Sequence, residues 1–285
     1  MLEMLVNPKR AERRAWEMFF IGLFYASLSI LLVNWIFSSD PVLSKYSGIL
    51  IVTFCVMFSM PFMFYAIKLE EEKDLRIEGF SRILKEHSKA LMAFMWLFFG
   101  FIVAFSFWYI VFPSSNILRA QIETYCMINR PGNFNECIEQ YGISGAKKTT
   151  GFLTSKEKLI AIFTNNVYVL IFTLIFSLVF GAGAIFILSW NASVISAAVG
   201  IFSKGGIHDL PLGIARFMIH GFFEIASYFA GALAGGIISV AVIRHDVRNE
   251  KFWSILQDSL NLIILSIILL FFAALIEVFI TPLLF

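Results

Sequence analysis

A long apolar stretch from Arg216 to Ile243 carries a histidine and a glutamate, at His220 and Glu224. If this stretch is an α-helix, with about 100° of rotation per residue, one narrow face collects its polar and small side chains. These are His220, Glu224, Ser227, Gly231, Ala234 and Gly235. A carboxylate at the centre of a membrane helix costs roughly 3 kcal/mol unless it is satisfied. We therefore expect Glu224 to face protein or water, and the small residues to let a neighbouring helix approach closely.

The composition identifies the environment of this helix. Of the 285 residues, 59% are hydrophobic and 33 are phenylalanine, and the mean hydropathy is +0.82. Such a chain cannot build a soluble domain with a polar exterior, so we predict a multi-pass protein of the cell membrane. The formal net charge of +2 gives no reason to expect a nucleic-acid partner.

Apolar runs of bilayer-spanning length predict an all-α bundle of about seven transmembrane helices. The first run is longer than a typical signal-peptide core and has no cleavage site, so we expect it to be retained. The predicted spans cover residues 17–37, 48–67, 90–112, 159–180, 184–202, 216–243 and 260–280.

Basic residues predict the orientation of the bundle. Lys9, Arg10, Arg13 and Arg14 precede the first span, which favours a cytoplasmic N-terminus. Residues 68–89 are rich in lysine and arginine, with Phe80, Ile83 and Leu84 close to one face. We expect this segment to form an amphipathic helix at the cytoplasmic surface. Residues 1–89 would then hold two transmembrane helices and this surface helix, and residues 90–285 a five-helix core.

Residues 114–157 form the one sizeable loop, which the parity of the spans puts outside the cytoplasm. Cys126 and Cys137 lie close together in this loop. They can form a disulfide in an oxidising compartment, or remain two free cysteines.

Buried amide and carboxyl groups gather in the fourth to sixth spans. With about 1.5 Å of rise per residue, Asn165 and Asn166 reach a depth of roughly 11 Å from the outer surface, and Glu224 reaches a similar depth. Asn191 lies slightly deeper. These asparagines can hold helices together or line a hydrated cavity. Glu277, about one turn from the outer end of the last span, can instead extend its carboxylate to the surface.

His220 and Glu224 are four residues apart, so their side chains meet on one helix face. They can form a hydrogen-bonded structural pair, ligate a metal ion, or act in a proton or cation relay. Zinc normally needs three or four protein ligands, and no HExxH motif or second intramembrane histidine is present. We therefore favour the structural interpretation, and we expect no cofactor and no catalytic residue.

Three motifs, in order, resemble one membrane-protein family. They are TNN at 164–166, FGAGAIFILSWNASVISAAVG at 180–200 and IHGFFEIASYFAGALAGG at 219–236. Together they are similar to stage II sporulation protein M, over about residues 90–285. The resemblance implies a multi-helix membrane protein without established enzymatic activity, whose namesake works with peptidoglycan-processing partners. By matching position, Asn165, Asn166, Asn191, His220 and Glu224 carry the family pattern.

Three functions follow as hypotheses. The first is a non-catalytic protein of envelope organisation that acts through a protein partner or self-association. In that case the small-residue ridge of Ala226, Ala230 and Ala234, beside Gly231 and Gly235, could form a dimer interface. The second is an ion or small-solute transporter or channel that uses the buried polar residues. The third is an intramembrane enzyme with a metal-bound water at His220 and Glu224.

Overall fold

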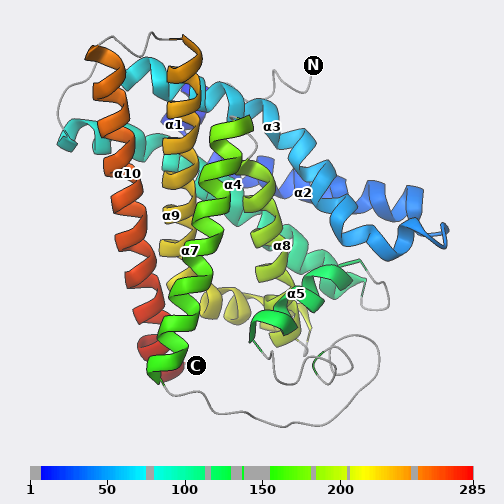
Figure 1. Cartoon of the computed structure of the whole chain (residues 1–285). Helices are drawn as coiled ribbons and strands as arrows, with labels where there is room; N and C mark the ends of the chain where they lie inside the picture. The colour runs from blue at the N-terminus through cyan, green and yellow to red at the C-terminus, as the bar shows by residue number, and fades with distance from the viewer. Residues whose placement is uncertain are drawn as a thin grey trace.

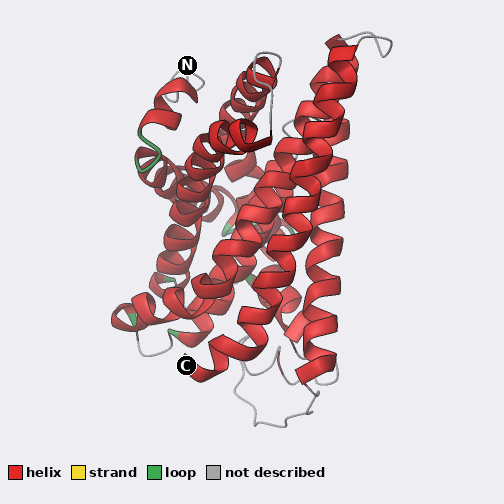
Figure 2. Cartoon of the chain, turned by 90° about the vertical axis from the view of Figure 1, so that its left-hand side faces the viewer, coloured by secondary structure: helices red, strands yellow, loops and turns green. Residues whose placement is uncertain are grey.

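The computed structural model describes residues 8–74, 80–112, 117–129, 137, 155–180, 184–203, 206–244 and 250–284. Every ordered element within these ranges is a helix (Figure 2). The helices are α1 (Pro8–Arg13), α2 (Glu17–Phe37), α3 (Ser47–Asp74), α4 (Phe80–Val111), α5 (Arg119–Asn129), α7 (Ser155–Phe180), α8 (Ala184–Phe202), α9 (Leu210–Arg244), α10 (Glu250–Leu275) and α11 (Thr281–Leu284). A π-helical turn, Ile276–Ile280, joins the last two.

Seven of the described helices are long and apolar enough to cross a membrane. They are α2, α3, α4, α7, α8, α9 and the continuous helical segment from α10 to α11. This confirms the predicted all-α membrane bundle. Two predicted spans, 17–37 and 184–202, match the observed helices α2 and α8 residue for residue.

The segment predicted as one amphipathic surface helix, 68–89, is shared between two long helices in the described residues. Residues 68–74 continue α3, and residues 80–89 are the beginning of α4. The charged residues therefore extend two spanning helices beyond their apolar parts, because helical hydrogen bonding does not stop where hydrophobicity does. The connection at 75–79 lies outside the described residues.

Helix α9 is the centre of the bundle. It packs against α10, α7, α8, α4 and α3. In its most apolar stretch 72% of the residues are buried, compared with 17% for α7 and 22% for the last span. Helices α7, α9 and α10 stand side by side, whereas α2 and α3 extend away from them on the other side (Figure 1). The end of the bundle where α7 begins and the last span ends, at the bottom of Figure 1, is called the C-terminal side below.

Small residues bring α7 close to α9, as the sequence predicts. A methyl group added at Gly231 would lie 2.4 Å from a side-chain atom of Leu170, and one at Gly235 would lie 2.8 Å from the carbonyl oxygen of Leu174. The hydroxyl of Ser177 also donates a hydrogen bond across this contact, 2.5 Å long, to the carbonyl oxygen of Ala232. Close approach and interhelical hydrogen bonding together hold α7 on α9.

Most of the small-residue ridge of α9 is covered by other helices of the same chain. Ala230 and Ala234 are fully buried within the chain, and Gly231 and Gly235 contact α7. Neighbouring helices of the same chain thus cover these four residues, while Ala226 is half-buried, so the structure gives no support to this ridge as a dimer interface.

The two N-terminal spans attach to the rest of the bundle mainly through α4 and α8. Helix α2 lies so close to α4 that a methyl group on Gly22 would come within 2.1 Å of the carbonyl oxygen of Leu97. On the facing side, a methyl group on Gly100 would come within 2.3 Å of the carbonyl oxygen of Phe19. The backbones of the two helices are therefore in direct contact at this crossing.

Helix α5 lies at the C-terminal side, where it packs against α8 and α3. A disulfide joins Cys126 of α5 to Cys137, with the two Cα atoms 5.7 Å apart. The amide of Gln121 donates a hydrogen bond of 3.0 Å to the carbonyl oxygen of Gly48 in α3. Its packing and the Gln121 bond hold α5 on α8 and α3, whereas most of the predicted loop at 114–157 lies outside the described residues.

Candidate functional site: a polar cavity within the bundle

The polar residues singled out in the fourth to sixth spans surround one cavity of about 380 Å³. Its walls come from α5, α7, α8, α9 and the π-helical turn before α11. The polar side chains that line it are Tyr125, Asn165, Asn166, Asn191, His220, Glu224, Tyr228 and Glu277. Residues more than a hundred positions apart in the sequence thus share one space.

Glu224 is held by the neighbouring helix α7. Its carboxylate accepts a hydrogen bond of 2.5 Å from the side-chain amide of Asn166. The amide of Asn165 in turn donates toward the side-chain oxygen of Asn166 at 3.5 Å, the upper limit for such a contact. Because α7 and α9 approach closely through Gly231 and Gly235, the side-chain amide of Asn166 reaches the carboxylate of Glu224 directly.

His220 and Glu224 do not pair with one another, although their spacing allows it. The hydroxyl of Thr281 lies 3.3 Å from Nδ1 of His220, so the described partner of the imidazole comes from α11. Glu224 is bonded to α7 instead. His220 and Glu224 therefore connect α9 to two different helices, α11 and α7. The spacing of the two residues within α9 could not indicate these partners.

Asn191 lines the cavity from α8. Its side-chain amide donates a hydrogen bond of 2.8 Å to the carbonyl oxygen of Ile187, one turn earlier in the same helix. This bond orients the side chain without tying α8 to another helix. The group faces the cavity as a lining residue and does not hold two helices together.

Glu277 was missed by the sequence interpretation, which allowed it to extend toward the membrane surface. In the structure it lines the same cavity as Glu224. It sits in the π-helical turn Ile276–Ile280, where both the backbone N–H and the side-chain hydroxyl of Thr281 donate to the carbonyl oxygen of Ile276, five residues back, the hydroxyl at 3.2 Å. Such wide turns recur at functional sites because they redirect side chains. No described residue donates a hydrogen bond to the Glu277 carboxylate.

The serines and glycines at the helix contacts, called the small-residue stripes here, have a packing role. Beside the Ser177 contact, the hydroxyl of Ser196 donates to the carbonyl oxygen of Ile102 at 3.1 Å, and that of Ser227 to the carbonyl oxygen of Ser266 at 2.8 Å. These bonds tie α8 to α4 and α9 to α10. The stripes thus build the walls, while the larger polar groups face the cavity.

A metal ion would find an incomplete ligand set. Among the described residues, no group of three histidine, cysteine, aspartate or glutamate side chains lies close enough to hold a metal. His220 and Glu224 supply two donors, fewer than the three protein ligands of a typical catalytic zinc site.

The chemistry of the lining favours a positively charged occupant. Two carboxylates, three side-chain amides and two phenol groups face the cavity, and none of its lining residues is lysine or arginine. Since a water molecule takes up about 30 Å³ of liquid, the cavity is large enough for several waters or for a small solute. Tyr125, Phe217 and Tyr228 add aromatic surface, which attracts organic cations.

The fold and the cavity define a class: a polytopic helical membrane protein with a polar intramembrane cavity. Residues 90–282 match the family described as stage II sporulation protein M, and the chain belongs to this family. Every residue that lines the cavity falls within the matched range. The recognition from the three sequence motifs is thereby confirmed.

One relative is an uncharacterized protein, MJ0793, of Methanocaldococcus jannaschii. It is 34% identical to this chain over 125 residues, which are 43% of this chain and 70% of the relative. No solved structure matches the chain.

Proposed function

We propose that this protein binds a small cation in the polar cavity and passes it along a path through the membrane. The observation that carries the proposal is the meeting of Glu224 and Glu277, from separate helical segments, at a cavity without a lining lysine or arginine. Intramembrane carboxylates are costly to maintain, and their usual roles are ion pathways and proton relays.

A purely structural role explains the two carboxylates less well. Packing of α9 already depends on glycine contacts and serine hydrogen bonds, as at Gly235 and Ser227. Asn166 satisfies one oxygen of Glu224, but no described residue donates a hydrogen bond to Glu277. A carboxylate kept only for stability would be expected to have such a partner, because Glu277 is half-buried and an unpaired carboxylate inside a helix bundle destabilises the fold.

For the orientation we keep the sequence prediction of a cytoplasmic N-terminus in the cell membrane. The disulfide at Cys126 supports it, because disulfides persist in oxidising compartments outside the cytoplasm. The C-terminal side of the bundle, with α5 and the cavity wall at Tyr125, would then face outward.

The test is cation flux in liposomes that contain the purified protein. Proton entry is followed with an internal pH-sensitive dye, and sodium, potassium and ethylammonium are tested as competing or transported ions. We expect Glu224→Gln and Glu277→Gln to fold normally and to lose flux, because glutamine keeps hydrogen bonding but removes the charge. Glu123→Gln is the matched control, since Glu123 lies on α5 in an exposed ion pair with Arg119 and outside the cavity lining.

The hypothesis of a scaffold that acts through a protein partner or self-association predicts a different result. It is supported by the family membership and by the extensive serine-mediated packing of α8, α9 and α10. Under this hypothesis the protein would show no flux above empty liposomes for any of these cations, and both glutamine variants would behave as the unaltered chain. That outcome would refute the transport proposal.

A further inference from the structure

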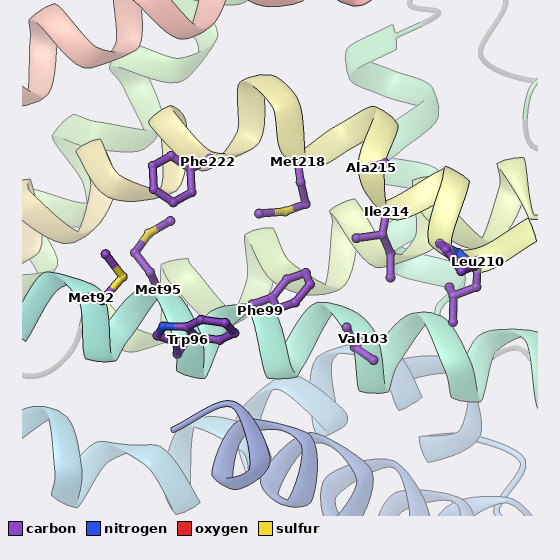
Figure 3. A pocket seen from close by; sticks show the side chains of 11 residues that line it. Met92, Met95, Trp96, Phe99, Val103, Leu210, Ile214, Ala215, Met218 and Phe222 are labelled. Atoms are coloured by element: carbon purple, nitrogen blue, oxygen red, sulfur yellow. The ribbon is translucent and has the colours of Figure 1, made fainter. Parts of the chain in front are cut away.

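A second hollow borders α9 on a different face of the helix from the polar cavity. It is a groove of about 680 Å³ between α4 and α9, and its lining is entirely apolar. Met92 of α4 and Met218 and Phe222 of α9 point into the space between the two helices (Figure 3). Trp96, Val103 and Ala215 also line the groove. None of its lining residues is shared with the polar cavity.

The groove is open to the hydrocarbon of the bilayer. Met92, Trp96 and Phe222 are 45%, 37% and 43% exposed, and all three belong to segments that span the membrane. Water does not reach such a surface from the hydrocarbon core, so the groove must be filled by an apolar group. In this environment the abundant apolar groups are lipid tails.

The dimensions of the groove fit one lipid tail. The lining residues Met92 to Val103 on α4, at 1.5 Å of rise per residue, extend over about 16 Å. This is close to half of the hydrocarbon thickness of a bilayer, which is about 30 Å, and hence to the reach of a tail from one leaflet.

A second helix fits the groove poorly. Helices α4 and α9 contact each other beside it, where the rings of Phe94 and Phe229 stack with centroids 5.1 Å apart. A helix with its side chains is about 10–12 Å across, so it would have to separate these two helices to enter. A flexible chain of methylene groups can enter without moving them. The methionines Met92, Met95 and Met218 also suit a flexible occupant, because the unbranched thioether chain adapts its shape.

We propose that the groove between α4 and α9 is a binding site for one hydrocarbon tail of a membrane lipid. The tail fills the space between the two helices and remains bound for longer than the freely exchanging lipids around the bundle. The site is independent of the polar cavity and of any transport through it.

The test combines lipid retention with fluorescence quenching. Protein extracted in mild detergent is analysed by native mass spectrometry for retained phospholipid. We expect the unaltered chain to retain one lipid, and Ala215→Phe, which places a ring in the groove, to lose it. Val179→Phe is the matched control, because Val179 is 60% exposed on the lipid-facing surface of α7 and does not line the groove.

Trp96 reports on the groove directly. In vesicles of phosphatidylcholine with dibrominated tails, the share of quenching due to Trp96 is the difference between the unaltered chain and Trp96→Phe. We expect Ala215→Phe to reduce this share and Val179→Phe to leave it unchanged. If Ala215→Phe fails to fold, Val103→Phe tests the same space from α4.

Two results would overturn the proposal. One is the absence of retained lipid together with equal Trp96 quenching in all folded variants, which would mean that side chains close the groove. The other is a dimer of the unaltered chain that Ala215→Phe converts to a monomer, which would assign the groove to a second copy.

Discussion

The crossing of α2 and α4 allows a sharp test of how closely the N-terminal spans adhere to the family core. Gly22→Ala would place a methyl group 2.1 Å from the carbonyl oxygen of Leu97, and Cβ atoms essentially never approach other heavy atoms within 3.0 Å. The helices would therefore have to move apart locally by about 0.9 Å, the difference between these two distances. Both partners are backbone, so no flexible side chain can yield.

Overpacking of this kind costs about 1–3 kcal/mol, and we expect roughly 2 kcal/mol for Gly22→Ala. Gly221→Ala is the matched control: it is also a buried helical glycine, but an added methyl group there meets no atom within 4 Å. The assay is unfolding in mixed micelles of mild detergent and sodium dodecyl sulfate, followed by tryptophan fluorescence. The Gly22 variant should unfold at a lower fraction of dodecyl sulfate, and the Gly221 variant near that of the unaltered chain. Equal midpoints for all three proteins would refute the direct backbone contact.

Two further predictions concern the regions between spans. Replacing Cys126 and Cys137 by serine should lower stability by about 2–3 kcal/mol, because the disulfide closes a short loop. Thermal melts with and without reductant measure this loss. Asp40 accepts hydrogen bonds from the backbone amides of Leu43 and Val42, which lower its pKa below the usual value of 3.8. The stability that the Asp40 carboxylate contributes is therefore present above pH 3.8 and is lost as the pH falls through the lowered pKa. We expect the difference in stability between the unaltered chain and Asp40→Asn to shrink on acidification from pH 7 to pH 3. Unfolding titrations at several pH values measure this difference.

Hydropathy predicted the spanning helices because the bilayer demands long apolar runs with internally satisfied backbones. It predicted their ends less well. Helix α4 begins at Phe80, ten residues before the predicted span, and α10 begins at Glu250, ten residues before its predicted span. In both places polar residues continue the helix beyond the hydrocarbon, where hydropathy no longer reports on structure.

The candidate site was partly predictable. Asn166, Asn191 and Glu224 stand out because amides and carboxylates are rare in membrane spans, and comparable depth brought them to one level. The partners were not predictable: Glu224 bonds to α7 and His220 to Thr281, and only the packing of separate helices decides this. Glu277 escaped because the π-helical turn that carries it has no clear sequence signal.

The polar cavity draws all its walls from residues 125–277, and none from α2 or α3. The two N-terminal spans pack mainly against α4 and α8, with α3 also touching α9, and they widen the area that the protein occupies in the bilayer. Substitutions within residues 8–74 can therefore affect the polar cavity only indirectly, through the helices that form its walls. The outer surface of α2 and α3 can therefore change in sequence, to suit a different lipid or protein contact, without changing the residues that line the polar cavity.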